Sequence, residues 1–251
     1  FDGARRGKIG GGQVGFTTFV VPMGALGFWE ERLKRLHISF RQTARFHETY
    51  LQFKDWEGMQ LEIVEREEGP PSKWAFDGIP SDKAIKGFGG AILYSTAPDK
   101  TRKALDVMGL AEVEEESGFV RYRSYGDLGN VIDLNVIPME YGIGGAGTVH
   151  HIAWRAKTEE ETITWRQQVL AAGFAPTGIL DRNYFKSVYF REHGGILFEI
   201  ASDTPGFLID EPYESLGEKL MLPTWLEPHR EVLEPNLVPI TVREVEGERR
   251  G

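Results

Sequence analysis

Two short strand-like segments carry the side chains that could do chemistry in this 251-residue chain. His150 and His151 lie next to each other in the first segment, and Glu199 lies in the second, about 50 residues later. Imidazole and carboxylate groups hold Fe(II) or Mn(II) in the arrangement of two histidines and one carboxylate, which leaves open positions for substrate and oxygen. His151 and Glu199 are therefore candidate members of such a site.

Alternation along the two segments predicts that these side chains face one another. Ile152 and Trp154 share one face of the first strand, so that His151 faces the other way. Phe198 and Ile200 share a face of the second strand in the same manner, and Glu199 points to the opposite side. If a helix covers the apolar face, His151 and Glu199 converge. The alternative is a partly buried histidine that is hydrogen-bonded to a structural glutamate.

Other titratable residues fit a metal site less well. Glu62 and Asp133 occupy the positions in two earlier segments that Glu199 occupies in the third, but no histidine precedes them in the matching strands. We expect both to be solvated or structural. Four remaining histidines lie at a helix end, among charged residues, in a turn and in a Pro-rich segment: His37, His47, His193 and His229.

The elements that must position these residues recur three times along the chain. Each repeat has a Gly-led apolar strand, an amphipathic helix and three further short strands, which is a βαβββ order. The fold class predicted is α+β, with mixed sheets. Helices are expected at 24–36 (with Phe28, Trp29, Leu33 and Leu36 at helical spacing), after Pro98, and at 159–172. The predicted regions are a unit with a leading linker at 1–70, a unit at 83–140, a unit carrying the metal site at 146–203 and an extended Pro-rich tail at 204–251 that wraps the body.

Composition excludes several classes of protein. The 29 Lys and Arg against 38 Asp and Glu give a net charge of −9, which repels nucleic acid. The absence of cysteine excludes disulfides and thiolate metal sites. The longest uncharged stretch, 9–29, contains six glycines, and this predicts that no membrane is spanned. The glycine runs precede strands, whereas phosphate-binding glycines follow a strand and open a helix.

Several blocks, in order, resemble the ring-cleaving dioxygenases of the hydroquinone-cleaving branch of the vicinal-oxygen-chelate superfamily, to which glyoxalases and bleomycin-resistance proteins also belong. They are GTVHHIAW (147–154), DRNYFKSVYFRE (181–192), GGILFEIA (194–201) and LPTWLEP (222–228), with weaker likeness at 12–14 and 28–32. The resemblance covers nearly the whole chain and implies curled mixed sheets of the glyoxalase and extradiol dioxygenase type.

The resemblance also implies a reaction and a set of roles. His151 and Glu199 would bind the metal, which is Fe(II) with Mn(II) or another divalent ion as alternatives. His150 would act as an acid and base, and Arg182 and Tyr189 would position the phenolic substrate. The partners expected are a small hydroquinone- or catechol-type aromatic substrate and O2, in the cytoplasm.

The chain departs from the family pattern in two places. The family has four units and takes its other ligating histidine from the opening strand of the first, which this chain lacks. The middle unit reads GFGG at 87–90, where relatives often show GFHG. With Phe1 as its first residue, the chain is interpreted as a fragment, or as one chain of a split enzyme whose partner supplies the histidine-bearing unit; a homo-oligomer is a further expectation.

Two other functions stay open at this point. The first is a glyoxalase-like isomerase or lyase that uses a divalent metal without consuming O2, because one fold can host both chemistries. The second is a non-catalytic paralogue that binds an aromatic ligand.

Overall fold

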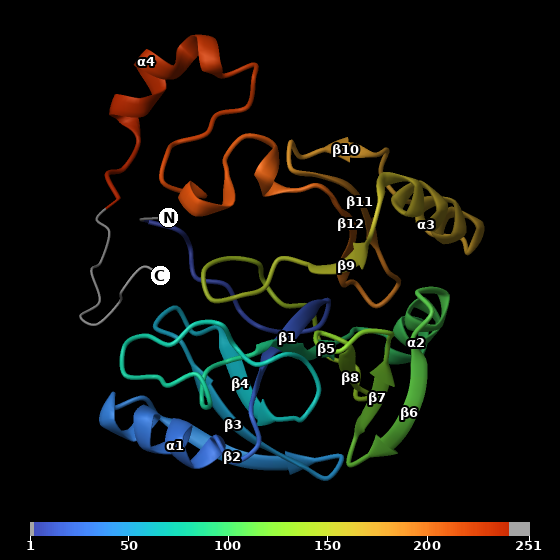
Figure 1. The fold of residues 1–251 in the computed structure, drawn as a ribbon. Coiled ribbons are helices and arrows are strands. Elements are labelled where there is room, and N and C mark those ends of the chain that lie inside the picture. Colours follow the sequence, from blue (N-terminus) through green and yellow to red (C-terminus); the bar gives the residue numbers. More distant parts are fainter. Residues whose placement is uncertain (1–2, 241–251) are drawn as a thin grey trace.

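The computed structural model describes residues 3–240 and arranges them as three βαβββ units (Figure 1). The first two units share one eight-stranded sheet, and the third forms a separate four-stranded sheet. Residues 1–2 and 241–251, which belong to the predicted first region and tail, lie outside the described residues. No helix between residues 3 and 240 is long and apolar enough to cross a membrane.

The first two units are joined through their opening strands. β1 and β5 pair antiparallel in the middle of the sheet, and the full strand order is β2-β3-β4-β1-β5-β8-β7-β6. The first unit consists of β1 (Gln13–Val21), α1 (Leu26–Arg35), β2 (Phe40–Arg45), β3 (Glu48–Lys54) and β4 (Gln60–Glu65). The second consists of β5 (Gly87–Tyr94), α2 (Pro98–Val107), β6 (Ala111–Glu116), β7 (Phe119–Arg123) and β8 (Val131–Asn135).

The third unit has the same element order but stands alone as a sheet. Its strands run in the order β10-β11-β12-β9, so that β9 lies at an edge. The unit consists of β9 (Ile152–Ala156), α3 (Glu159–Ala171), β10 (Leu180–Asp181), β11 (Phe185–Arg191) and β12 (Leu197–Pro205). The short helical turns that follow are Phe207–Ile209, Tyr213–Ser215, Glu227–His229, α4 (Arg230–Leu233) and Glu234–Asn236.

Two element boundaries and the conformation of one segment differ from the sequence expectations. The first helix ends at Arg35, and Leu36, expected on its apolar stripe, is 51% exposed. The opening strand of the third unit begins at Ile152, so His151, which was expected within this strand, lies just before it. The segment after Pro205 was expected to be extended, yet it contains the short helical turns given above. Prolines lie at the first positions of two of these turns, where proline is tolerated because its missing N–H would have no partner within the helix.

Each helix covers one face of its own unit and leaves the other face for polar side chains. Trp29 and Leu33 of α1 pack against Val21, Leu51 and Ile63, which alternate with polar residues along their strands. Burial of such large side chains stabilises by about 1.5–3 kcal/mol each. The amphipathic strands therefore fix which side of the sheet the charged residues occupy.

Charged residues fill the face of the eight-stranded sheet that lies opposite α1. Arg45 binds Glu62 (Nη2–Oε1, 2.5 Å) and Asp133 (Nε–Oδ2, 2.6 Å), and Arg121 binds Asp133 (Nε–Oδ1, 2.8 Å). Arg121 also pairs with Glu48 (2.5 Å). Glu62 and Asp133 are 0% and 2% exposed. Of the two expectations for these carboxylates, the structural one is confirmed.

Stability of this sheet should depend on pH through Glu48. Burial by itself would raise the pKa of Glu48, but hydrogen bonds and charges from Arg66 and Arg121 outweigh burial and lower it to about 2 from 4.5. A lowered folded-state pKa gives stability above pH 4.5 that is lost as the pH falls toward 2. The contribution is about 3 kcal/mol at neutral pH. Urea unfolding followed by circular dichroism between pH 2 and 7 should show this loss, and Glu48→Gln should flatten it; an unchanged pH profile in Glu48→Gln would contradict the assignment.

A buried carboxylate attaches the third unit to the second. Glu192, 2% exposed in the turn between β11 and β12, accepts hydrogen bonds from Thr101 Oγ1 (2.9 Å) and from the backbone N–H groups of Gly194 and Ile196 (2.7 Å each). Thr96 donates to the Gly194 carbonyl from its backbone N–H and its hydroxyl. A carboxylate that accepts several hydrogen bonds is stable when buried.

Removing this carboxylate should destabilise the contact between the units. Glu192→Ala leaves two buried N–H groups without an acceptor, whereas the Thr101 hydroxyl keeps the Ser95 hydroxyl as a partner (2.7 Å), and the loss costs about 2–4 kcal/mol in total. The measurement is the free energy of urea unfolding, with the exposed Glu231→Ala as the matched control that should change it little. Equal effects of the two substitutions would mean that Glu192 does not hold the units together.

Candidate metal site

The third unit positions its candidate residues through strand register. Within the four-stranded sheet, Glu199 of β12 lies opposite Tyr189 of β11 and opposite Ala153 of β9. His151 precedes Ala153 by two residues and therefore faces the same side as Glu199. The sequence-derived convergence of His151 and Glu199 is confirmed by this arrangement.

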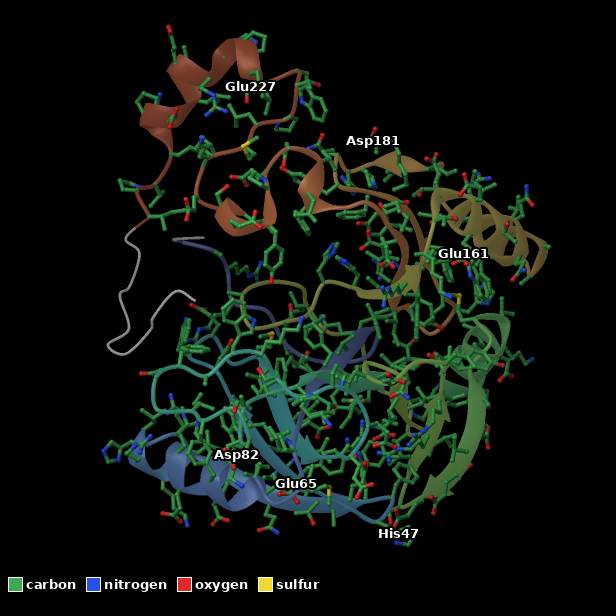
Figure 2. The ribbon with its side chains drawn as sticks, viewed as in Figure 1. His47, Glu65, Asp82, Glu161, Asp181 and Glu227 are labelled. Carbon is green, nitrogen blue, oxygen red and sulfur yellow. The ribbon has the colours of Figure 1, made fainter. Side chains whose placement is uncertain are left out.

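The opposite face of this sheet is apolar and covered by α3. Trp154, Phe198 and Ile200 belong to a core cluster that also includes Val169 of α3. The Thr158 hydroxyl caps the helix by accepting from the Glu161 N–H (3.3 Å). Figure 2 shows Glu161 on the α3 side of the unit and Asp181 on β10. Packing of α3 thus directs the polar residues of β9, β11 and β12 to the free face.

Glu199 has one oxygen occupied and one free. The Nε2 of His151 lies 2.7 Å from Oε2 of Glu199, and the two side chains are 32% and 4% exposed. Oε1 of Glu199 is buried, with no hydrogen-bond partner among the described residues. An unsatisfied buried acceptor costs about 1–3 kcal/mol, so this oxygen needs a donor or a cation.

His150 extends the pair into a chain of polar contacts. Its Nδ1 lies 2.9 Å from Nδ1 of His151, with the two rings perpendicular. A neutral His151 that donates from Nε2 to Glu199 must accept at Nδ1, which assigns the donor role to His150. The exposed His150 side chain thus connects His151 with the surface of the unit.

Tyr189 and Arg182 complete the group. The Tyr189 ring meets the His151 ring edge-on at 5.6 Å between centroids, and the Arg182 guanidinium carbon lies 5.4 Å from the Tyr189 centroid. Burial, followed by a hydrogen bond with Glu199, raises the pKa of Tyr189. Its phenol therefore stays protonated at neutral pH and serves as a hydrogen-bond donor. All five residues expected from the sequence are brought together.

One polar residue of this face was missed by sequence reasoning. Ser187 is fully buried, and its hydroxyl has no hydrogen-bond partner in the described part of the chain. It lies two residues before Tyr189 on β11 and so shares the face of Tyr189 and Glu199. Alternation along β11 places Ser187 on the same face as Tyr189, but a single serine in a strand is too common to indicate a functional residue.

The donor set fits part of a metal site. An imidazole nitrogen in contact with a buried carboxylate that has a free oxygen suits Fe(II) or Mn(II). No group of three or more His, Cys, Asp or Glu residues that could hold a metal occurs between residues 3 and 240. His47 lies at the far end of the eight-stranded sheet (Figure 2), and His193 stacks on Phe174 (4.7 Å). The unit thus presents two adjacent ligands on an open sheet face.

A family model matches a segment that spans parts of the second and third units. Residues 93–200, which include most of the third unit, match the model of the Glyoxalase/Bleomycin resistance protein/Dioxygenase superfamily. A likeness of this kind fixes the fold more firmly than the chemistry.

Individual relatives extend the match over nearly the whole chain. The Bacillus subtilis (strain 168) protein named "putative ring-cleaving dioxygenase MhqO" is 54% identical, over 97% of this chain and 78% of the relative. Chlorohydroquinone/hydroquinone 1,2-dioxygenase of Sphingobium indicum is 29% identical, over 88% and 71%. A crystal structure from Bacillus subtilis subsp. subtilis str. 168, named "putative dioxygenase", superposes with a TM-score of 0.93 at 55% identity, over 96% and 78%. The chain therefore belongs to the glyoxalase/bleomycin resistance protein/dioxygenase superfamily, beside members that are named ring-cleaving dioxygenases.

Proposed function

We propose that this protein takes part in metal-dependent, ring-cleaving oxygenation of a hydroquinone- or catechol-type phenol by O2. The observation that carries the proposal is the contact of His151 with a buried Glu199 that keeps one oxygen free. The names of the relatives support the reaction class, and the hydroquinone dioxygenase among them supports the substrate class. A cytoplasmic location stays a prediction.

His151 and Glu199 would hold the metal, with Fe(II) as the expected ion and Mn(II) or another divalent ion as alternatives. When bound, the metal supplies the electron transfer that brings the phenolate and O2 to react. Both groups would hold the metal in their deprotonated forms, so the proton shared by His151 and Glu199 would be released when a metal binds.

The third ligand is proposed to come from outside the described residues. In the first two units, the opening strands β1 and β5 pair antiparallel, whereas β9 pairs only with β12 among residues 3–240. The outer edge of β9 has no strand partner among these residues, and the opening strand of another βαβββ unit, in a partner chain or a second copy, is proposed to pair there. A histidine on that strand would lie beside His151 and complete the set.

Tyr189, Arg182 and His150 would handle the substrate. The protonated phenol of Tyr189 donates a hydrogen bond to negative charge that develops on the ring oxygen. Arg182 holds the Tyr189 ring by cation–π contact and adds positive charge to the same face. His150, exposed beside His151, would accept the proton that the substrate hydroxyl loses.

Substitution of Glu199 tests the ligand assignment. In anaerobically loaded protein, Glu199→Ala should reduce retained Fe(II) or Mn(II) at least 100-fold, because it removes the buried carboxylate that contacts His151. Metal content after desalting is the measurement, and Asp203→Asn, on the same strand, is the matched control. Full metal retention in Glu199→Ala would refute the assignment.

Oxygen uptake separates the three functions considered from the sequence. Metal-loaded protein should consume O2 with hydroquinone, and the product should have an opened ring. Turnover of a hemithioacetal without O2 uptake would favour the isomerase or lyase. Tight binding of a phenol to metal-free protein, with no product, would favour the non-catalytic paralogue.

Tyr189→Phe tests the donor role separately from metal binding. Loss of the phenol should lower kcat with hydroquinone roughly 10- to 100-fold, as is common for groups that support a metal site. Metal content should stay at the wild-type level, since the phenol is not a proposed ligand. An unchanged kcat would contradict the proposed hydrogen bond from Tyr189 to the substrate.

A further inference from the structure

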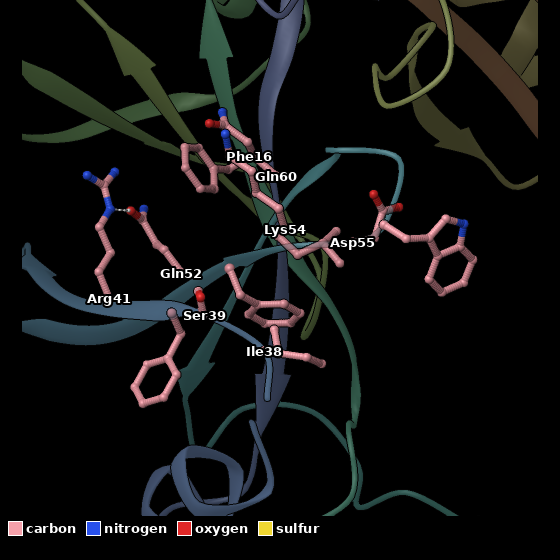
Figure 3. A pocket seen from close by; sticks show the side chains of 12 residues that line it. Phe16, Ile38, Ser39, Arg41, Gln52, Lys54, Asp55 and Gln60 are labelled. Atoms are coloured by element: carbon pink, nitrogen blue, oxygen red, sulfur yellow. Dashed lines mark hydrogen bonds between the residues drawn. The ribbon is translucent and has the colours of Figure 1, made fainter. Parts of the chain in front are cut away.

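A cavity of about 840 Å³ lies at the end of the eight-stranded sheet that is formed by β2, β3, β4 and β1 (Figure 3). This volume is within the range of small-molecule pockets, roughly 300–1,000 Å³. Its polar lining comes chiefly from Arg41, Gln52, Lys54 and Gln60. Its aromatic lining residues are Phe16, Phe40, Phe53 and Trp56, of which Phe40 and Phe53 pack with the cluster beneath α1.

The polar residues of this cavity form two rows across the sheet. Arg41 lies opposite Gln52, and Gln52 lies opposite Glu62; one step along, Lys54 lies opposite Gln60. All of them face away from α1, because they alternate with residues such as Leu51 that pack against the helix. Arg41 and Lys54 therefore present two cations on one face of the sheet end.

Arg41 is anchored through its Nε, and its two Nη groups are not used in hydrogen bonds with described residues. Its Nε donates to Oε1 of Gln52 (2.9 Å), and Gln52 donates from Nε2 to Oε2 of Glu62 (2.8 Å). Gln52 is only 7% exposed, so this support is fixed. The two Nη groups of Arg41 have no hydrogen-bond partner among residues 3–240. The Arg41 side chain is exposed, and its guanidinium can bind a planar acceptor with two oxygens through both Nη groups.

The local charge of the cavity is positive, although the chain as a whole carries −9. Glu62 beneath Gln52 is already neutralised by Arg45. Asp55 at the rim accepts from the Met59 N–H (2.8 Å), and no ion pair with Arg41 or Lys54 occurs within the described part of the chain. Two cations against one carboxylate favour an anionic ligand.

The cavity occupies the place in the first unit that the candidate metal site occupies in the third. Glu62 lies opposite Thr18 and Gln52, as Glu199 lies opposite Ala153 and Tyr189. Phe16, two residues before Thr18, thus takes the position of His151, and Gln52 takes that of Tyr189. The first unit therefore has an aromatic ring, Phe16, where the third unit has the ligating nitrogen of His151.

We propose that this cavity binds a small aromatic carboxylate without metal. Arg41 receives the carboxylate through its two Nη groups, Lys54 adds a second positive charge, and the ring of the ligand packs against Phe16, which faces the same side of the sheet. The site is separate from the His151–Glu199 pair and lies on the other sheet.

Fluorine NMR titration with 4-fluorobenzoate tests the proposal, and the neutral 4-fluorobenzamide serves as the matched probe. Arg41→Gln should weaken 4-fluorobenzoate binding at least tenfold and leave the weak binding of the amide unchanged. Lys54→Gln should weaken it by a smaller factor. Arg35→Gln, an exposed arginine of the same unit, is the control for net charge. Circular dichroism checks that each variant is folded.

Each result decides for or against the site. Selective loss in Arg41→Gln, with wild-type affinity in Arg35→Gln and in Glu199→Gln, supports it. Equal affinity of Arg41→Gln and wild-type protein, no binding of 4-fluorobenzoate, or loss of binding only in Glu199→Gln would overturn it. The last of these results would assign the ligand to the candidate metal site.

Discussion

Each of the three units buries a carboxylate at the same position of its closing strand, and the group that neutralises this charge determines what the unit can do. An uncompensated carboxylate cannot be buried at reasonable cost. Arg45 satisfies Glu62, and with Arg121 it satisfies Asp133, through contacts of 2.5–2.8 Å. Glu199 has no arginine beside it but pairs with His151, and its Oε1 has no hydrogen-bond partner among residues 3–240. The first two units are thereby closed to a metal ion, whereas the third keeps a place for one.

Strand pairing also distinguishes the third unit from the first two units. β1 and β5 join the first two into one sheet, and their face holds a network of arginine and carboxylate groups. The third unit is attached to the second through the hydrogen bonds of Glu192, outside any shared sheet, and its β9 edge is free among residues 3–240. The open edge and the incomplete ligand set are therefore two consequences of one arrangement, in which the third unit has no paired unit within the described residues.

Local patterns in the sequence were sufficient for the element order and for the meeting of His151 with Glu199, because strand alternation and helix periodicity determine both. The arginine network was not predictable, since Arg45 and Asp133 are 88 residues apart and meet only through the pairing of β1 with β5. The free hydroxyl of Ser187 was missed for a similar reason: burial of a small polar residue depends on the packing of the whole sheet. The exposure of Leu36 follows from where the first helix ends, which periodicity defines only loosely.

A divalent metal is proposed to bind between His151 and Glu199 of the third unit. An anomalous difference map from crystals loaded with Mn(II) is the sharpest test of this binding. One peak is expected in contact with both His151 Nε2 and a Glu199 oxygen. A peak beside Glu62 or Asp133, or no peak near His151 in fully loaded protein, would contradict it.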